Sequence, residues 1–282
     1  MVKIIDGKEI AKKIKNEIKE KVFILNSQGK RVPKIVVVKA NNDGASESYT
    51  KSIVKVAGNL GYEAERFDLS ANASVTEILN LISKLNKDDS IDGIIVQRPL
   101  PKNIMASKIN ESLLPEKDID GVHPLNMGYL MMKHKGLVPS TPKAVDYVFD
   151  YEKIDLTGKK VAIVGRSDIV GKPVGMLMLN RNATVIYCHS KTKDLTSVLK
   201  NVDVVIAATG VAHLIDGNMI SEGSIVIDVG INFLNGKMVG DVEFESASEV
   251  ADRITPVPGG IGSITTAMLM KNLMEAYENH EG

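Results

Sequence analysis

The sequence predicts an α/β protein in which mostly parallel sheets carry helices on their faces. Three observations support this prediction: short apolar runs bounded by turn residues, amphipathic segments between them, and a regular alternation of the two. Strands buried on both faces read as continuous apolar runs, as in KIVVVK at 34–39. The 282 residues exceed what one hydrophobic core usually serves, so we expect two domains.

The first half of the chain alternates helix and strand. Apolar residues recur every four positions in the first expected helix, which covers about 7–23 and begins at the capping pair Asp6 and Glu9. The other expected elements are strands at 34–39, 62–69 and 93–97, a helix from about Ser46 to Gly61, and a helix capped by Ser74 and Glu77.

The second half continues the same alternation. Thr141 is expected to cap a helix that begins at Pro142, because proline is favoured at the first helical position. The other expected elements are strands at 161–165, 184–188, 203–207 and 224–229, a helix at 172–180, and a last amphipathic helix over about 265–277.

The stretch KKVAIVGRSDIVGKPVG at 159–175 carries the clearest sign of function. Gly165, Gly171 and Gly175 follow a buried strand where a helix should begin. Glycines let backbone N–H groups approach a diphosphate, and the helix directs its positive N-terminus at the same anion. The spacing differs from G-x-G-x-x-G, and other αβ turns also carry glycines. The stretch still favours a dinucleotide-binding turn.

The residues after the next strand favour NADP over NAD. An NAD-selective fold places an Asp or Glu near the end of that strand to hold the ribose 2′-hydroxyl, whereas a 2′-phosphate needs cations and hydroxyls. The sequence there is His189-Ser190-Lys191-Thr192, without a carboxylate, and Arg166 lies in the glycine turn. We therefore expect NADP as the cofactor.

Candidate ligand-binding residues follow other expected strands, because open α/β sheets bind ligands beyond the carboxyl ends of their strands. Tyr49 and Gln97 occupy such positions, and Asp120 lies in the charged loop 117–124. Asp120 could accept two hydrogen bonds from an amide-like ring edge. A lone tyrosine can equally pack in a core, and a charged loop can simply be solvated. The Pro/Gly-rich stretch 254–262 is expected to form a wall of a cleft rather than a linker.

Composition excludes several classes of partner. Lys+Arg and Asp+Glu both number 35, so net charge gives no reason to expect binding to nucleic acid or to an anionic membrane. The single cysteine, Cys188, excludes an internal disulfide and a cysteine-rich metal site, so no metal is expected. No apolar run is long enough to span a bilayer, and a cytoplasmic location is expected.

Seven segments together closely resemble the bifunctional 5,10-methylenetetrahydrofolate dehydrogenase/5,10-methenyltetrahydrofolate cyclohydrolase family, in one order over nearly the whole chain. They are GIIVQRPLP, KDIDGVHP, GRSDIVGKP, CHSKT, DVVIAATG, VIDVGIN and ITPVPGGIG. The resemblance implies two αβ domains around a cleft and a homodimer. It implies a folate-binding catalytic domain at 1–139, with the last helix at about 264–282 packing back on it, and a Rossmann-like NADP-binding domain at 140–263.

The resemblance also implies roles for individual residues. Together with the glycine turn, it gives an expected NADP site of Gly165, Arg166, Ser167, Gly171, Ser190, Lys191 and Ile231. The expected catalytic and folate-contacting residues are Tyr49, Gln97 and Asp120, and the residues expected to line the cleft are Pro258, Gly259 and Gly260.

One departure from the family pattern bears on the reaction. The family normally carries a lysine four residues after the tyrosine of its substrate helix, where it serves the cyclohydrolase step, and here that position holds Ile53. Arg98 and Ser263 are further departures near the expected cleft. The sequence therefore predicts an NADP-dependent methylenetetrahydrofolate dehydrogenase with weak or absent cyclohydrolase activity. A fully bifunctional enzyme, a cyclohydrolase alone and a non-catalytic NADP-binding protein are the alternatives.

Overall fold

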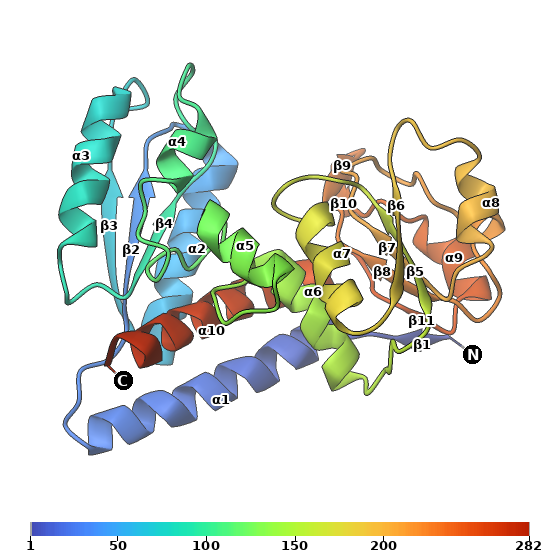
Figure 1. The fold of residues 1–282 in the computed structure, drawn as a ribbon, viewed down its shortest axis with the longest axis horizontal. Coiled ribbons are helices and arrows are strands. Elements are labelled where there is room, and N and C mark those ends of the chain that lie inside the picture. The colour runs from blue at the N-terminus through green and yellow to red at the C-terminus, as the bar shows by residue number, and fades with distance from the viewer. Residues whose placement is uncertain (1, 282) are drawn as a thin grey trace. The chain divides into compact units, whose positions relative to one another are not determined.

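The computed structural model describes residues 2–281, which form two compact units (Figure 1). The six-stranded unit contains the chain up to Lys13 together with Thr141–Met268, and the three-stranded unit contains Ile14–Ser140 and the chain from Leu269 onward. Two long helices, α1 (Gly7–Ser27) and α10 (Ile261–Glu281), each contribute residues to both units.

The six-stranded unit is built on a fully parallel sheet with the order β1-β11-β8-β7-β5-β6. Its strands are β1 (Lys3–Ile4), β5 (Lys160–Val164), β6 (Thr184–Cys188), β7 (Val204–Ala207), β8 (Ile225–Asp228) and β11 (Arg253–Ile254). The neighbours of β5 are β6 on one side and β7 on the other. Its carboxyl end is therefore a switch point, where such sheets bind ligands.

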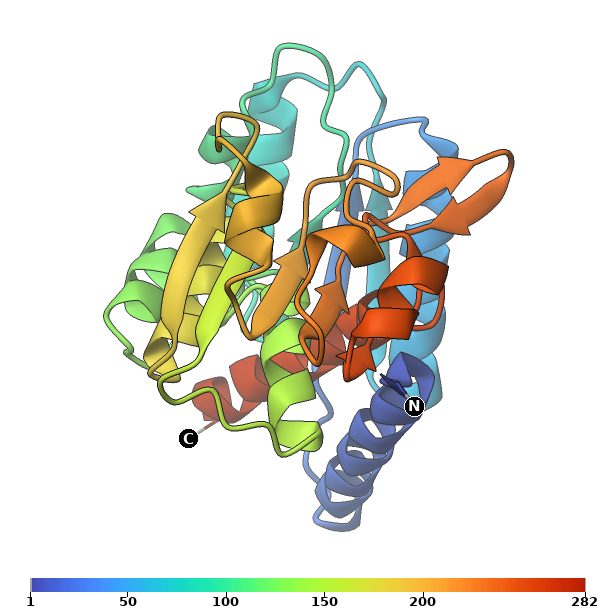
Figure 2. The ribbon, with the colours of Figure 1, turned by 90° about the vertical axis from the view of Figure 1, so that its right-hand side faces the viewer.

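Helices cover both faces of this sheet (Figure 1). They are α6 (Ser140–Tyr151), α7 (Gly171–Asn180), α8 (Leu195–Leu199) and α9 (Phe244–Val250), with the short 3-10 helix η1 (Gly217–Met219). Leu199 of α8 and Ala247 of α9 share one apolar core with Val164 and Val205 of the sheet. The antiparallel hairpin of β9 (Asn232–Leu234) and β10 (Lys237–Val239) follows β8 and projects from the unit (Figure 2).

The three-stranded unit is built on a parallel sheet with the order β3-β2-β4. Its elements are β2 (Lys34–Lys39), α2 (Gly44–Leu60), β3 (Glu63–Asp68), α3 (Val75–Asn86), β4 (Gly93–Val96), α4 (Ala106–Asn110) and α5 (Pro124–Met131). Val36 and Val38 pack with Ile78 and Ile82 of α3. Because side chains alternate along a strand, Val37 and Lys39 point to the opposite face, on which α2 lies (Figure 1).

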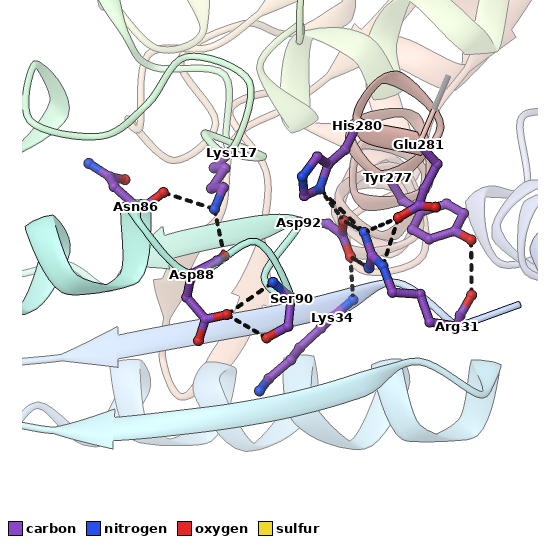
Figure 3. A network of polar contacts seen from close by, with 10 residues as sticks. All are labelled: Arg31, Lys34, Asn86, Asp88, Ser90, Asp92, Lys117, Tyr277, His280 and Glu281. Atoms are coloured by element: carbon purple, nitrogen blue, oxygen red, sulfur yellow. Dashed lines mark hydrogen bonds and ion pairs between the residues drawn. The ribbon is translucent and has the colours of Figure 1, made fainter.

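A buried ion-pair network links the sheet of this unit to the end of α10 (Figure 3). The Asp92 side chain is completely buried and accepts two hydrogen bonds from Arg31, of 2.7 and 2.8 Å, and one from the Lys34 backbone N–H, of 2.9 Å. Nδ1 of His280 lies 3.1 Å from Asp92, and Glu281 pairs with the outer side of Arg31. Asp92 thus joins segments that are far apart in sequence.

One expectation about the elements needs correction. Thr141 does not cap its helix, because α6 begins at Ser140 and Thr141 lies inside it, with Oγ1 at 3.4 Å from Thr265 Oγ1. β1 pairs with β11, and the chain up to Lys13 clusters with the six-stranded unit. The mostly parallel α/β fold itself is confirmed.

Candidate active site

The glycine turn of the six-stranded unit depends on close backbone packing. Gly165 follows β5 with φ +127°, and a Cβ there would lie 2.1 Å from the carbonyl oxygen of Ala208. Gly171 opens α7, where a Cβ would lie 2.4 Å from the carbonyl oxygen of Gly165. Ser167 Oγ accepts a hydrogen bond from the Gly171 N–H at 3.3 Å. Only glycines fit here, and the positive N-terminus of α7 is directed at the end of β5.

The loop after β6 holds Ser190 and Lys191 at the surface. The His189 N–H donates to Thr192 Oγ1 at 2.8 Å, and the Lys191 N–H donates to His189 Nδ1 at 3.1 Å. Ser190, Lys191 and Arg166 are exposed. A cation and a hydroxyl therefore stand at the strand end where an adenosine ribose binds in such folds.

A pocket of about 190 Å³ lies at the carboxyl end of β8. It brings together Ile231, Pro258, Gly259 and Gly260, all of which the sequence analysis singled out, and it also includes Ser263. Ile231 is 55% exposed, so its side chain is available to a ligand. The floor includes Asp228, a residue that the sequence analysis missed because nothing in an apolar strand ending in Asp distinguishes a buried carboxylate from a surface one.

A larger pocket of about 510 Å³ occupies the opposite, amino edge of the same sheet. Its lining includes Lys160, Asp203 and Ser224, and none of the predicted site residues. Since open α/β sheets bind their ligands at the carboxyl edge, the smaller pocket is the better candidate.

The predicted residues of the three-stranded unit lie on α2, at the carboxyl end of β4 and in the loop beside that strand. Tyr49 stands on α2 and is 37% exposed. Gln97 follows β4, donates its backbone N–H to the Val38 carbonyl at 2.8 Å, and is 5% exposed. Asp118 bridges Ile94 of β4, which places the loop carrying Asp120 beside that strand. Ser140 Oγ donates to Asp120 Oδ1 at 3.2 Å, and burial raises the pKa of Asp120.

Several buried polar atoms in this region have no hydrogen-bond partner. They are Ser46 Oγ and Thr50 Oγ1 on the buried stripe of α2, and Nε2 of Gln97. Buried polar atoms without partners are rare in folded proteins and indicate that water or a ligand supplies the missing bonds. Sequence analysis missed Ser46 and Thr50, although their four-residue spacing places them on one helix face.

Ile53 lies on the same buried stripe of α2 and is completely buried. Lys39, at the end of β2, is nearly as buried: its Nζ donates to the Asn41 carbonyl at 2.5 Å and lies 3.4 Å from Glu47. Lys39 and Gln97 point to the sheet face on which α2 lies, since Val38 and Val96 pack on the other. Although position 53 holds no amine, the three-stranded unit therefore has a buried lysine, Lys39, that is a candidate for acid/base chemistry.

Asp118 is a buried acid of the three-stranded unit whose pKa is raised. Burial raises its pKa from 3.8 to about 6, against the opposing hydrogen bonds from the His123 N–H and Asn126. Its Oδ1 has no partner. The folded protein holds this proton more tightly than the unfolded chain, so Asp118 contributes stability below pH 3.8 that is lost as pH rises through about 6.

We expect Asp118→Asn to remove this dependence. Between the two pKa values the wild-type protein should lose roughly 3 kcal/mol of unfolding free energy relative to the variant. Urea denaturation of both proteins at several pH values from about 3.5 to 7 measures the difference. Asp89→Asn, at an exposed aspartate, is the control. A constant difference between wild type and Asp118→Asn across this range would contradict the assignment.

Neither a metal-binding cluster nor a membrane-spanning helix occurs among residues 2–281. No group of three or more His, Cys, Asp or Glu side chains in this range could hold a metal ion. No helix in the same range is long and apolar enough to cross a membrane.

The fold and the glycine turn together define a class. A parallel sheet with a glycine turn at its switch point, an exposed cation beyond the next strand and a pocket at the carboxyl edge are typical of dinucleotide-binding dehydrogenases. The family models that match are the NAD(P)-binding domain of tetrahydrofolate dehydrogenase/cyclohydrolase, over residues 139–281, and its catalytic domain, over residues 5–120. The chain belongs to the tetrahydrofolate dehydrogenase/cyclohydrolase family.

Individual relatives match over almost their full length. The chain is 46% identical over 279 residues to the "Bifunctional protein FolD" of Aquifex aeolicus, covering 99% of this chain and 96% of that one. Among solved structures, a FolD from Campylobacter jejuni is 43% identical with a TM-score of 0.97, covering 99% of both chains. A FolD from Trypanosoma brucei, solved with NADP cofactor and an inhibitor, is 33% identical with a TM-score of 0.94, covering 99% of this chain and 98% of that one.

Proposed function

We propose that this protein oxidises 5,10-methylenetetrahydrofolate to 5,10-methenyltetrahydrofolate by hydride transfer to NADP, with weak or absent cyclohydrolase activity. The observation that carries the hydride step is the pair of glycines at 165 and 171, whose backbone packing leaves room for no side chain. Membership of a family of dehydrogenases supports the reaction, and the relatives named bifunctional support the folate substrate.

The residues of the six-stranded unit fit the proposed cofactor. Gly165, Ser167 and Gly171 would hold the diphosphate at the start of α7, and Ser190 and Lys191 would hold the 2′-phosphate. Ile231 and the wall of Pro258, Gly259 and Gly260 would hold the nicotinamide end in the 190 Å³ pocket. Bound NADP supplies the hydride acceptor. The protein's own contribution is proximity and orientation, which together are worth about 7–11 kcal/mol of barrier reduction.

The folate contacts are assigned to the three-stranded unit. Asp120 would accept hydrogen bonds from the edge of the folate ring, while Tyr49 and Gln97 would orient the reacting methylene bridge. The product cation is stabilised by the lone pair of the folate nitrogen, so this step requires no protein acid or base. The assignment of residues 1–139 and 264–282 to folate and of 140–263 to NADP, with a cleft between them, stays a prediction.

NADP preference can be tested at the loop after β6. We expect Ser190→Asp to lower the ratio of NADP to NAD specificity at least tenfold, or ~1.4 kcal/mol, because a carboxylate repels the 2′-phosphate and accepts from ribose hydroxyls. Steady-state kcat/KM with each cofactor measures the change. Lys159→Glu, at the opposite edge of the sheet, also makes the protein more negative and should leave the ratio of NADP to NAD specificity unchanged. Equal ratios in Ser190→Asp and wild type would contradict the assignment.

The doubt about cyclohydrolase activity rests on Ile53. Hydrolysis of the methenyl cation needs a water to be deprotonated and a ring nitrogen to be protonated, and general acid/base help is typically worth ~10² to 10⁴ in rate. An isoleucine provides neither proton transfer. The proposal takes position 53 as that of the family's lysine, and the unpartnered buried atoms of Ser46, Thr50 and Gln97 support a lost polar neighbour there.

Full bifunctionality is the alternative that a specific observation favours. Lys39 is a buried lysine at the carboxyl end of β2, on the α2 side of the sheet, and an amine there could take the place of the absent one. The bifunctional enzyme and the dehydrogenase without cyclohydrolase activity are expected to respond differently to Lys39→Met. This variant abolishes hydrolysis if Lys39 carries it, and it changes nothing catalytic if the wild-type protein has no cyclohydrolase activity.

One set of assays tests the proposed function. Formation of reduced cofactor from methylenetetrahydrofolate is followed by its absorbance with NADP and NAD in parallel, and decay of methenyltetrahydrofolate is followed with and without enzyme. We expect reduction with NADP and hydrolysis close to the spontaneous rate. Cofactor binding without reduction would indicate a non-catalytic NADP-binding protein. Hydrolysis without reduction would indicate a cyclohydrolase alone.

A homodimer is part of the proposal. Large apolar side chains at Phe233, Leu234 and Met238 are 72%, 45% and 38% exposed on the β9–β10 hairpin (Figure 2), and exposed apolar patches of this kind often mark interfaces. Sedimentation velocity of the purified protein tests the assembly. A cytoplasmic location stays an expectation from the sequence.

A further inference from the structure

A single buried carboxylate, that of Asp241, holds both loops that follow β7 and β8. Asp241 is completely buried and belongs to neither loop. Its Oδ2 accepts hydrogen bonds from Oγ1 of Thr209 at 2.9 Å, from the Thr209 N–H, and from the Gly210 N–H at 3.0 Å. Its Oδ1 accepts from Asn232 Nδ2 at 2.9 Å. Both oxygens are therefore used, one for each loop.

A second buried carboxylate, that of Asp228, holds Asp241 itself. Asp228 Oδ1 accepts from the Asp241 N–H at 3.1 Å and from the Gly230 N–H at 2.9 Å, and its Oδ2 accepts from the Val242 N–H at 2.9 Å. A Cβ on Gly230 would lie 2.1 Å from Asp241 Oδ1, so the loop lies directly against the carboxylate. Charge-assisted hydrogen bonds of this kind are about twice as strong as neutral ones.

The two loops lie on the side of the sheet that should receive the nicotinamide. The glycine turn at the end of β5 holds the diphosphate, and β6, on one side of β5, carries the residues expected to contact the adenosine. β7 and β8 follow on the other side, so the remaining half of the dinucleotide extends across their ends. Gly230 and Ile231 line the 190 Å³ pocket there.

We propose that Asp241 is a positioning residue for the nicotinamide half of the dinucleotide, acting through the loops of Thr209–Gly210 and Gly230–Asn232. The inference rests on the proposed function for the identity of the ligand. It assigns to a residue outside every predicted motif the task of setting the spacing between two loops that themselves contact the cofactor. Without the carboxylate, several buried donors lose their acceptor, and the loops move to find others.

The test compares Asp241→Asn with Asp203→Asn. Asp203 is the matched control, because its carboxylate also accepts a backbone N–H, that of Lys160 at 2.7 Å, but at the amino edge of the same sheet. Binding of NADP and of adenosine 2′,5′-bisphosphate, which lacks the nicotinamide half, is measured by calorimetry. Asp241→Asn should weaken NADP at least tenfold, equivalent to ~1.4 kcal/mol, and the fragment less than about twofold. Asp203→Asn should leave both unchanged.

Asn232→Ala provides a second variant in case Asp241→Asn fails to fold, since it removes one contact and should weaken NADP in the same direction. Equal weakening of NADP and of the fragment, or no weakening of either, would overturn the inference. Wild-type protein that binds no NADP would overturn both proposals. NADP binding without oxidation of methylenetetrahydrofolate would overturn the proposed function alone and leave the role of Asp241 standing.

Discussion

Ile53→Lys is expected to create enzyme-dependent hydrolysis of methenyltetrahydrofolate, about 10² to 10⁴ above the wild-type protein. Ile53 is completely buried, so burial lowers the pKa of an introduced lysine and favours the neutral amine that can accept a proton from water. The unpartnered atoms of Ser46, Thr50 and Gln97 are available as hydrogen-bond partners in the same region. Hydrolysis is measured by the loss of methenyltetrahydrofolate absorbance, corrected for the spontaneous reaction.

Ile53→Met is the matched control, because it offers an unbranched side chain without an amine. It should fold and leave hydrolysis at the wild-type level. The lysine variant should be less stable, since a charged group in a fully buried site is costly, and a thermal melt establishes that the protein assayed is folded. A folded Ile53→Lys protein without added hydrolysis would contradict the idea that this position alone limits the second activity, and would direct attention to Arg98 and Ser263.

Asp92→Ala is expected to reduce the free energy of unfolding by about 3–5 kcal/mol, the usual cost of removing one partner from a buried ion pair. The side chain of Asp92 is completely buried. Its carboxylate pairs with Arg31, accepts a hydrogen bond from the Lys34 N–H and contacts His280 (Figure 3). The hydrogen bonds that the Arg31 guanidinium donates to Asp92 raise the pKa of the guanidinium, which stays charged and loses its main partner in the variant. Urea denaturation measures the loss.

Glu281→Ala is the control for this network. Glu281 pairs with the same arginine, but its side chain is 46% exposed, and exposed pairs are worth only about 0–1 kcal/mol. A loss after Asp92→Ala as small as that after Glu281→Ala would show that the burial of Asp92 does not make its contacts strong.

The elements that could be predicted from sequence are those whose signals are local. The strands at 34–39 and 184–188 were predicted at their observed bounds, because each is a short run rich in β-branched and apolar residues between turn residues. The capping box of Ser74 and Glu77 is also confirmed, with both reciprocal hydrogen bonds. The strands β1 and β11 were missed, since each has two residues and exists only through pairing with a distant partner.

The candidate site divides in the same way. Glycines at 165 and 171 could be predicted because a strand, a turn and a helix follow one another within a few residues. The role of Asp241 could not be predicted, because its hydrogen-bond partners Thr209 and Asn232 lie in two other loops. No sequence pattern distinguishes a buried carboxylate from an exposed one. The same holds for Lys39, a buried lysine whose amine contacts the Asn41 carbonyl and Glu47 of α2.

The pairing of β1 with β11 has a consequence for the order of folding. Lys3 and its partner Arg253 are separated in sequence by all the other strands of the sheet. Contacts between residues so distant along the chain form slowly, whereas β5 to β8 are closer together in sequence and can associate earlier. We therefore expect the β1 edge of this sheet to form late in refolding, and a chain that has not yet docked β1 should present β11 as an open edge.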